Sequence, residues 1–224
     1  MSLSIIIPVY NEEECIAECI KEVKNVFKDD DTEIIVVNDG SNDNSHKIIS
    51  DIILKYPAIK YVRYKNNCGY SHAIREGFKN ATKEYITFID ADLQYHPKEL
   101  IKIYNFALIN NHMFVIGEPR NKYYNLFRKI LSKCYNIYVR IILGIDIKDA
   151  NSLKLINKNL LKNIKLQMEY GMVELELLYS LKKQKIPITK FPILVRERFA
   201  GASKCSLKII LHTLFSIAKL RLKK

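Results

Sequence analysis

The feature that most constrains this 224-residue sequence is the alternation of short apolar runs with amphipathic segments over its first half. Each run is rich in β-branched residues and has the length of a buried strand, whereas the segments between them repeat apolar residues at helical spacing. The predicted strands are Ser4–Val9, Glu33–Val37, Ile59–Tyr64, Glu84–Ile89 and Met113–Ile116. This order predicts an α/β fold, with an open, mostly parallel sheet and helices on both faces.

Three polar clusters directly follow predicted strands. They are Asn38-Asp39-Gly40-Ser41, Asn67-Cys68-Gly69 and Asp90-Ala91-Asp92. In an open parallel sheet, ligands bind beyond the carboxyl ends of the strands. The three clusters therefore predict one ligand site along that edge of the sheet.

Asp90 and Asp92 are carboxylates one residue apart at the end of the fourth predicted strand. On a strand that continued straight, both side chains would point to the same side. Two such oxygen ligands, with Gln94 in support, suit an Mg²⁺ or Mn²⁺ ion that bridges a diphosphate. The alternative is an ordinary acidic turn, because a D-x-D pair by itself is a weak signal.

Residues at the ends of the first two predicted strands could bind a nucleotide. Asp39 can accept an N–H group from a nucleobase, Tyr10 could flank the base, and Glu12 could contact the ribose. Pro8 closes the first strand beside them. The alternatives are an ordinary Asn-Asp-Gly turn at Asp39 and a helix cap that begins at Asn11.

Taken together, these elements resemble the family 2 glycosyltransferases. The motifs are Ile5-Ile6-Ile7-Pro8-Val9-Tyr10-Asn11-Glu12, Val37-Asn38-Asp39-Gly40-Ser41, Asn67-x-Gly69 and Asp90-Ala91-Asp92-Leu93-Gln94. The resemblance implies a nucleotide-diphospho-sugar transferase fold of the GT-A type, with Asp39 on the base. It also implies a nucleotide-sugar site that includes Pro8, Tyr10, Glu12, Val37, Asp39, Asp90, Ala91 and Asp92.

The second half of the chain resembles the polyprenyl-phosphate branch of that family, whose best-known members are the dolichol-phosphate mannosyltransferases. The matching elements are Arg128-x-x-x-Ser132, Asp149-Ala150-Asn151-Ser152-Leu153-Lys154-Leu155, Glu176-Leu177-Leu178 and Arg198-Phe199-Ala200-Gly201-Ala202-Ser203-Lys204. The resemblance implies that Arg198 and Lys204 face the donor phosphates. It also implies that Arg128 and Ser132 lie near the lipid phosphate.

Two departures from the family pattern are visible. Asn38 replaces the usual first acid of the D-D-G-S motif. After the fifth strand the chain has Gly117-Glu118-Pro119-Arg120 where the family usually has G-S-R. Arg120 is therefore the candidate for a nucleotide-sugar contact from a shifted loop, and the alternative is that this contact is lost.

The implied reaction is an inverting transfer of a sugar from GDP-mannose or a UDP-hexose to a polyprenyl or dolichyl phosphate. Asp90, Asp92, Arg198 and Lys204 would carry catalysis, because a metal and basic side chains stabilise the charge on the leaving diphosphate. The acceptor phosphate is already anionic and needs no strong base. The alternatives are the same fold with a glycan hydroxyl acceptor, and a basic membrane- or nucleic-acid-binding module without catalysis.

The net charge favours an anionic partner, since 36 Lys and Arg against 24 Asp and Glu give +12. Segments 121–143 and 207–224 combine apolar faces with basic residues, as helices at a membrane interface do. We therefore expect a catalytic domain over 1–206 and a basic amphipathic helix over 207–224 on an anionic membrane surface. The alternative is that both helices only cover the sheet.

Targeting and cysteine patterns complete the expectations. The sequence has neither a spanning apolar run nor a signal peptide at its start, which predicts a cytoplasmic protein, peripheral on the membrane, attached directly or through a membrane partner protein. The five cysteines lack paired C-x-x-C spacing, which predicts reduced thiols rather than zinc or disulfides. Nucleic acid is not an expected partner, because the acidic site would repel its phosphates unless a metal lies between.

Overall fold

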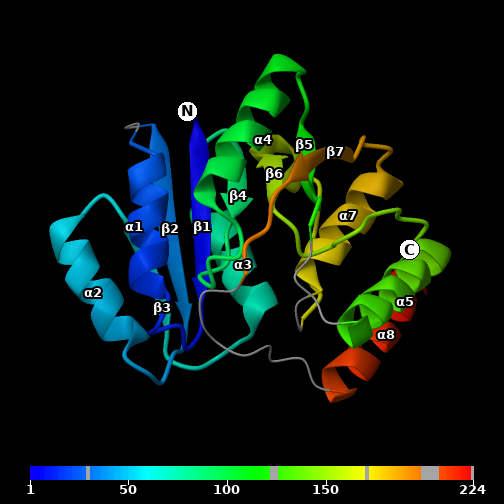
Figure 1. Ribbon diagram of the computed structural model, residues 1–224, viewed down its shortest axis with the longest axis horizontal. Helices are drawn as coiled ribbons and strands as arrows, with labels where there is room; N and C mark the ends of the chain where they lie inside the picture. The colour runs from blue at the N-terminus through cyan, green and yellow to red at the C-terminus, as the bar shows by residue number, and fades with distance from the viewer. Residues whose placement is uncertain (29–30, 122–125, 170–171, 198–206, 223–224) are drawn as a thin grey trace.

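The computed structural model describes residues 1–28, 31–121, 126–169, 172–197 and 207–222, and of residues 126–128 and 207–212 it describes the backbone only. Within these ranges the strands form one sheet in the order β3-β2-β1-β4-β6-β5-β7 (Figure 1). The strands are β1 Leu3–Val9, β2 Thr32–Asp39, β3 Lys60–Tyr64, β4 Tyr85–Phe88, β5 Phe114–Pro119, β6 Lys154–Asn157 and β7 Thr189–Ile193. The helices are α1 Ile16–Val26, α2 Ser45–Lys55, α3 Tyr70–Asn80, α4 Pro97–Ile109, α5 Leu126–Leu143, α6 Lys158–Leu161, α7 Val173–Lys183 and α8 Leu207–Leu222.

The sheet is parallel except at one strand. β1 runs parallel to β2 and β4, and β2 runs parallel to β3. β6 is antiparallel to both of its neighbours, β4 and β5, so β5 runs in the same direction as β1 and β4. β7 pairs in parallel with β5 at the edge of the sheet. Proline has no N–H to donate to a neighbouring strand, and the edge position of β7 tolerates Pro192 for this reason. The predicted open, mostly parallel sheet is confirmed.

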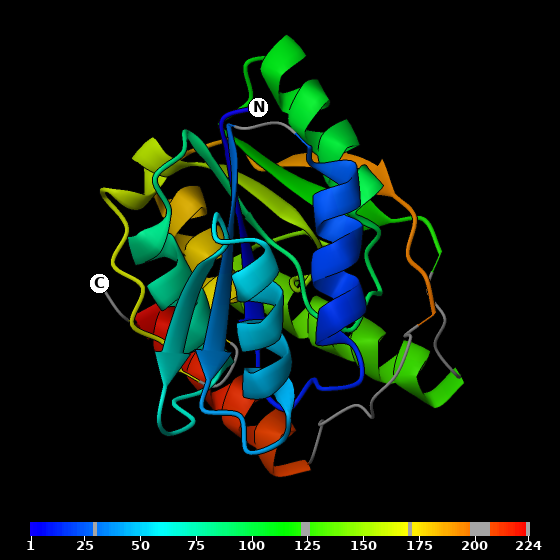
Figure 2. The same ribbon diagram turned by 90° about the vertical axis from the view of Figure 1, so that its left-hand side faces the viewer.

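Side chains of β1 alternate between two hydrophobic cores, one on each face of the sheet. Ile5 and Ile7 belong to the core that α1, α2 and α4 complete. Ile6 belongs to the core that α3, α5, α7 and α8 complete. Figure 2 shows α1 and α2 together in front of the sheet. The prediction of helices on both faces is therefore confirmed.

The turn that follows β1 differs from the prediction. Asn11 is predicted to cap the first helix, but its φ is +52° and α1 begins only at Ile16. The side-chain oxygen of Asn11 instead accepts the N–H of Asn42 at 2.9 Å. Asn11 therefore joins the loops after β1 and β2, and the helix-cap interpretation is wrong.

The second half of the chain follows the predicted order with shorter elements. The helix predicted over 121–143 is present as α5 from Leu126, and residues 122–125 lie outside the described residues. β6 begins at Lys154, after a turn in which Asp149 accepts the Asn151 N–H at 3.1 Å. The helix predicted at the tail is α8.

α5 and α8 lie side by side at the lower right of Figure 1, and β1 and β2 run toward the same lower end of the molecule. The Tyr138 hydroxyl donates to the Leu214 carbonyl at 3.0 Å, and Ile217 and Leu220 are buried in the core that also contains Val139. α8 is thus packed onto the domain along one of its faces. Among the described residues, no helix has both the length and the apolar content to cross a membrane.

Candidate active site

The carboxyl ends of β1, β2 and β4 meet at one edge of the sheet because these strands are parallel neighbours. Pro8 is the register partner of Val37, both buried near the ends of their strands. The Ile89 N–H donates to the Ile6 carbonyl at 2.9 Å. The pairing between β1 and β4 therefore continues to Ile89, one residue after the end of β4. The loops that carry the predicted site residues therefore start at this same edge.

The loops after β1 and β2 hold each other in place. Ser41 Oγ accepts the Asn11 N–H at 3.0 Å, and Ser45 Oγ accepts the Glu12 N–H at 2.9 Å. Tyr10 and Glu12 are half-buried at this junction. The structure thus brings Tyr10 and Glu12 to the end of β2, as predicted for residues around a nucleotide.

Asn38, which departs from the usual family acid, has a structural role. It is fully buried, its side-chain oxygen accepts the Ser41 N–H at 2.9 Å, and its Nδ2 donates to the Tyr61 hydroxyl at 3.0 Å. The neutral amide makes both bonds without burying a charge at this position. Asn38 therefore fixes the turn that presents Asp39.

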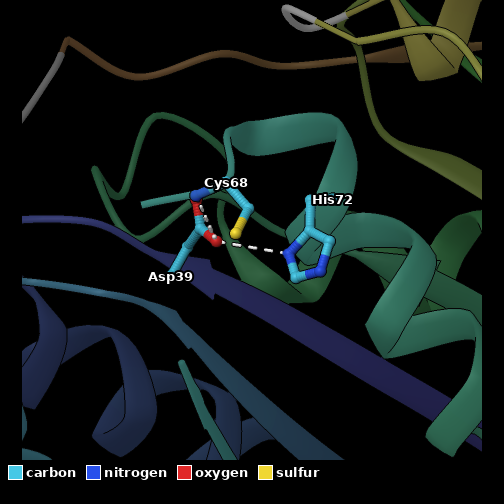
Figure 3. Close-up of side chains that lie close together, drawn as sticks. All are labelled: Asp39, Cys68 and His72. Atoms are coloured by element: carbon cyan, nitrogen blue, oxygen red, sulfur yellow. Dashed lines mark hydrogen bonds and ion pairs between the residues drawn. The ribbon is translucent and has the colours of Figure 1, made fainter. Parts of the chain in front are cut away.

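Asp39 is held by the turn between β3 and α3 (Figure 3). Its carboxylate is 2% exposed and accepts the Gly69 N–H at 2.6 Å and the Cys68 N–H at 3.1 Å. His72 Nδ1 lies 3.3 Å from Asp39 Oδ1. Gly69 has a φ of +95°, a conformation that favours glycine, so this residue type is needed for the turn.

Asp90 and Asp92 lie in a turn rather than on a straight strand. β4 ends at Phe88, and Leu93 has a φ of +60°, so the predicted same-side alternation does not apply. The turn is closed by the Gln94 N–H, which donates to Asp92 Oδ1 at 3.1 Å. It gathers two carboxylates and one amide, and these oxygen donors fit Mg²⁺ or Mn²⁺.

The electrostatics of this turn favour a cation. Burial, with the neighbouring carboxylates of Asp92 and Glu174, raises the pKa of Asp90 to about 7. Carboxylates so close together cannot all ionise without a compensating proton or cation. Asp90, Asp92 and Gln94 therefore have both the ligand chemistry and the negative charge to hold a divalent ion.

A buried hydrogen-bond network that the sequence did not reveal connects Asp90 with the second half of the chain. The Tyr70 hydroxyl lies 3.1 Å from Asp90 Oδ1 and 3.1 Å from Glu174 Oε1. Lys154 Nζ forms an ion pair with Glu174 and donates to the Ser152 carbonyl at 2.7 Å. Both members of this ion pair are at most 2% exposed.

A signal for the ion pair is present in the sequence. Lys154 stands between Leu153 and Leu155, and Glu174 stands between Val173 and Leu175. A charged residue inside an apolar run is buried with the run and needs a partner of opposite charge. This pattern predicts that each of the two residues is in a buried ion pair, but it does not identify the partner.

Glu176, whose role the resemblance leaves open, serves the backbone. Its carboxylate is 3% exposed and accepts the N–H groups of Gln167 and Met168, each at 2.8 Å. Glu176 therefore holds the loop before α7.

The segment after β7 contacts the turn that contains Asp90, Asp92 and Gln94, here called the acidic turn. The Arg196 N–H donates to the Gln94 carbonyl at 2.8 Å, and Arg196 Nη1 pairs with Glu22 at 2.9 Å. Arg196 thus ties this segment to the Asp90–Asp92 turn. Arg198 and Lys204, which follow it in the sequence, lie outside the described residues.

The remaining predicted residues come from the end of β5 and from α5. Arg120 directly follows β5, is exposed, and donates its backbone N–H to the Ile193 carbonyl at 3.0 Å. Ser132 is half-buried on α5, and the side chain of Arg128 lies outside the described residues. The structure therefore unites the residues of β1, β2 and β4, and it leaves the basic residues of the second half as predictions.

The sequence profile of the family described as Glycosyl transferase family 2 matches residues 4–171, which contain this whole strand-end arrangement. The chain belongs to glycosyl transferase family 2. The predicted family membership is confirmed, and so is the GT-A type fold. The family assignment covers the loops that carry Asp39, Asp90 and Asp92.

Family members with curated names are similar to the chain over different lengths. A dolichol-phosphate mannosyltransferase of Pyrococcus furiosus is 32% identical over 228 residues, which cover 98% of this chain and 64% of that protein. An undecaprenyl-phosphate 4-deoxy-4-formamido-L-arabinose transferase of Pectobacterium atrosepticum is 34% identical over 154 residues, which cover 66% of this chain and 46% of that protein. The chain therefore spans less than two thirds of the length of either relative.

A solved structure of the family fold is the glucosyl-3-phosphoglycerate synthase of Mycobacterium tuberculosis, in complex with Mn²⁺, UDP-glucose and phosphoglyceric acid. The TM-score is 0.72 at 16% identity, and the match covers 98% of this chain and 79% of the synthase. At this identity the likeness establishes the fold alone.

Proposed function

We propose that this chain transfers a sugar from a nucleotide-diphospho-sugar to a polyprenyl phosphate, with inversion at the anomeric carbon. The observation that carries the proposal is the meeting of Asp39 and the Asp90–Asp92 turn at the ends of three parallel strands. The names of the Pyrococcus and Pectobacterium relatives, which include dolichol phosphate and undecaprenyl phosphate, support this class of acceptor.

The donor nucleotide occupies the ends of β1 and β2 in this proposal. Asp39 accepts an N–H group from the base, and Tyr10 and Glu12 line the side of the base and the ribose. A carboxylate offers about four acceptor positions, so the backbone bonds to Asp39 leave capacity for the base. GDP-mannose and UDP-hexoses both present such N–H groups, so the donor has to be identified by experiment.

The diphosphate lies beside the acidic turn. A divalent ion held by Asp90, Asp92 and Gln94 would neutralise the charge of the leaving diphosphate when bound. Mn²⁺ and UDP-glucose in the Mycobacterium tuberculosis synthase support a divalent ion with a nucleotide-sugar. Arg198 and Lys204 add positive charge next to the diphosphate, and the bond between Arg196 and Gln94 ties the segment before them to this turn.

The acceptor supplies its own nucleophile. An oxygen of the lipid phosphate forms the new bond to the anomeric carbon while the bond to the nucleoside diphosphate breaks, which inverts the configuration. This oxygen is anionic at neutral pH, so no side chain has to remove a proton from it. Arg128 and Ser132 on α5 would bind the acceptor phosphate.

The exposed face of α5 supports contact with a membrane surface that carries the lipid acceptor. Ile130, Ile137 and Ile141 are 56%, 48% and 73% exposed, and Cys134 is exposed too. The spacing of these four residues, i, i+4, i+7 and i+11 in sequence order, places them in one stripe along the helix. Exposed Lys129, Lys133 and Arg140 lie along the same helix. Apolar and basic residues in this arrangement are typical of helices in a membrane interface. We propose a peripheral position on an anionic, cytoplasmic membrane face, with α5 as the contact.

The proposal is tested with labelled GDP-mannose, UDP-glucose and UDP-GlcNAc, each offered to a short polyprenyl phosphate and to the matching polyprenol, with and without Mn²⁺ or Mg²⁺. The expected result is a lipid-extractable product from one donor, only with the phosphate and only with the metal. Product from the polyprenol, or from a glycan acceptor alone, would move the function to hydroxyl glycosylation.

A further inference from the structure

A side-chain cluster at the end of β2 contains ligand chemistry that the proposed reaction does not use (Figure 3). Asp39 comes from β2, Cys68 from the turn after β3, and His72 from the first turn of α3. One carboxylate oxygen, the sulfur and one ring nitrogen lie within 4.8 Å of one another. Carboxylate, thiolate and imidazole are the ligands that Zn²⁺ takes in proteins.

Two of the three ligand atoms already have the spacing of a zinc site. Asp39 Oδ1 and His72 Nδ1 are 3.3 Å apart. Nitrogen and oxygen ligands bound tetrahedrally at about 2.05 Å from Zn²⁺ lie about 3.3 Å from each other, and a thiolate lies about 3.6 Å from each of them. The sulfur lies within 4.8 Å of both atoms, so it has to approach by at most about 1.2 Å. Cys68 is exposed and bonds only weakly to the Asn66 carbonyl, at 3.5 Å, so rotation of its side chain can provide this.

The scaffold around these ligands is fixed. A Cβ on Gly40 would lie 2.4 Å from the carbonyl carbon of Asn66, so the turns after β2 and β3 are in direct backbone contact. The His72 ring packs edge-on against Tyr64 with 4.4 Å between the ring centroids. A preformed position of two ligands lowers the ordering cost of binding an ion.

We propose that Asp39, Cys68 and His72 form a Zn²⁺ site whose occupation excludes the donor nucleotide. Asp39 Oδ2 already accepts the Gly69 N–H at 2.6 Å and the Cys68 N–H at 3.1 Å, so Zn²⁺ on Oδ1 would occupy the oxygen left for the base. This consequence rests on the proposed role of Asp39. The acidic turn offers oxygen ligands, which suit Mg²⁺ or Mn²⁺, whereas sulfur and nitrogen favour Zn²⁺. The two sites therefore differ in the ion that they select.

The sequence predicts no zinc site, because that prediction considered only pairs of cysteines close together in the sequence. Here the ligands come from three separate elements, and Asp39 and His72 are 33 residues apart. Only the packing of the turns after β2 and β3 brings them together.

Titration of the reduced chain with Co²⁺, followed by displacement with Zn²⁺, tests the site itself. The wild-type chain is expected to develop a thiolate-to-cobalt charge-transfer band that saturates with one ion at this site, apart from any ion on the Asp90–Asp92 turn. Cys68→Ser should lose this band, and Cys68→Ser and His72→Ala should each bind Zn²⁺ at least tenfold more weakly. Cys134→Ser removes an exposed cysteine on α5 and is the matched control, with band and affinity unchanged. An equal band in Cys68→Ser, or no ion bound by the wild-type chain, would overturn the site.

Zn²⁺ titration in the presence of UDP or GDP tests the competition, using the nucleotide that the chain binds. The expected result is a Zn²⁺ affinity at least tenfold lower at saturating nucleotide. An unchanged affinity with nucleotide bound would overturn the exclusion. Because ion binding is measured without sugar transfer, a chain that binds Zn²⁺ but transfers no sugar would count against the proposed function and in favour of this site.

Discussion

Tyr70 has one hydroxyl proton and two carboxylate neighbours at equal distance, so it can donate to only one of them at a time. The second contact needs a proton on the carboxyl group. Burial and the Asp92 and Glu174 charges raise the pKa of Asp90, and burial likewise raises the pKa of Glu174 despite the Lys154 ammonium. The cluster therefore has room for one compensating positive charge, which a divalent ion on Asp90 would provide.

Tyr70→Phe should lower the turnover number about 10- to 100-fold, because a hydrogen bond to a charged group contributes about 1.5–3 kcal/mol. The loss is expected together with a higher Mn²⁺ concentration for half-maximal activity, since Tyr70 orients a proposed metal ligand. Tyr64→Phe is the matched control: its hydroxyl donates to Glu76 at 2.6 Å, away from the acidic turn. Equal activity of the two variants would show that Tyr70 does not position Asp90.

Lys154→Met should destabilise the chain by about 3–5 kcal/mol, because it leaves Glu174 buried without its partner. Urea unfolding monitored by circular dichroism measures this change. The double variant Lys154→Met/Glu174→Leu should recover most of the loss, since neither charge is then buried. A single variant as stable as wild type would contradict the assignment of a buried ion pair.

At the residue scale, the sequence predicted which residues stand together at the strand ends. Asp39, Asp90 and Asp92 each stand just after an apolar run, and parallel strands bring such positions together. Tyr70 and Glu174 could not be paired in the same way, because they are 104 residues apart and meet only through the packing of α3 against α7.

At the scale of elements, Glu33 links the first strands of the sheet. Its carboxylate accepts the Ser4 hydroxyl from β1 and the backbone N–H of Thr82 before β4, and pairs with Lys60 from β3 at 2.6 Å. Burial would raise the pKa of Glu33, but Lys60 and the hydrogen bonds from Ser4 and Thr82 outweigh it and lower the pKa to about 2.

Glu33 should therefore make stability depend on pH in the acid range. Its ordinary pKa is 4.5, so the contribution is complete above that pH and is lost as the pH falls toward about 2. The lowering of the Glu33 pKa from 4.5 to about 2 corresponds to a loss of about 3 kcal/mol in the free energy of unfolding. Urea unfolding between pH 5 and pH 2.5 should show a flatter dependence in Glu33→Gln than in wild type, and parallel curves would contradict this.

Prediction of elements was accurate where hydrophobic periodicity is long and failed where geometry is local. The five predicted strands of the first half all occur, because each is an apolar run between helices. The four-residue helix α6 is too short to show a period, and the positive φ of Asn11 follows from its bonds to the next loop. The reversed direction of β6 follows from chain connection and not from its composition.

At the scale of the whole molecule, the strand ends of the proposed active site and the helix α5, which carries the apolar stripe, belong to the same end of the protein (Figure 1). A net charge of +12 adds attraction toward an anionic surface, at about 1 kcal/mol for each basic residue near it. The arrangement would place a lipid phosphate near the acidic turn while its chain stays in the membrane.

Ile137→Ser/Ile141→Ser should weaken binding to vesicles that contain anionic lipid by about tenfold or more, because each change removes exposed apolar area from the stripe. Sedimentation with vesicles measures the bound fraction. Leu54→Ser is the matched control, since Leu54 is 83% exposed on α2, outside α5 and α8. Equal binding of both variants would show that α5 is not the contact.

Sugar transfer to a polyprenyl phosphate at the acidic turn is tested most directly by the initial rate of that transfer for wild type and Asp92→Asn side by side. We expect a rate at least about 100-fold lower for Asp92→Asn, with its fold retained, because removal of preorganised charge stabilisation has this size. Asp51→Asn, an exposed acid on α2, should match wild type. Equal rates for Asp92→Asn and wild type, or no transfer by wild type, would contradict the proposed function.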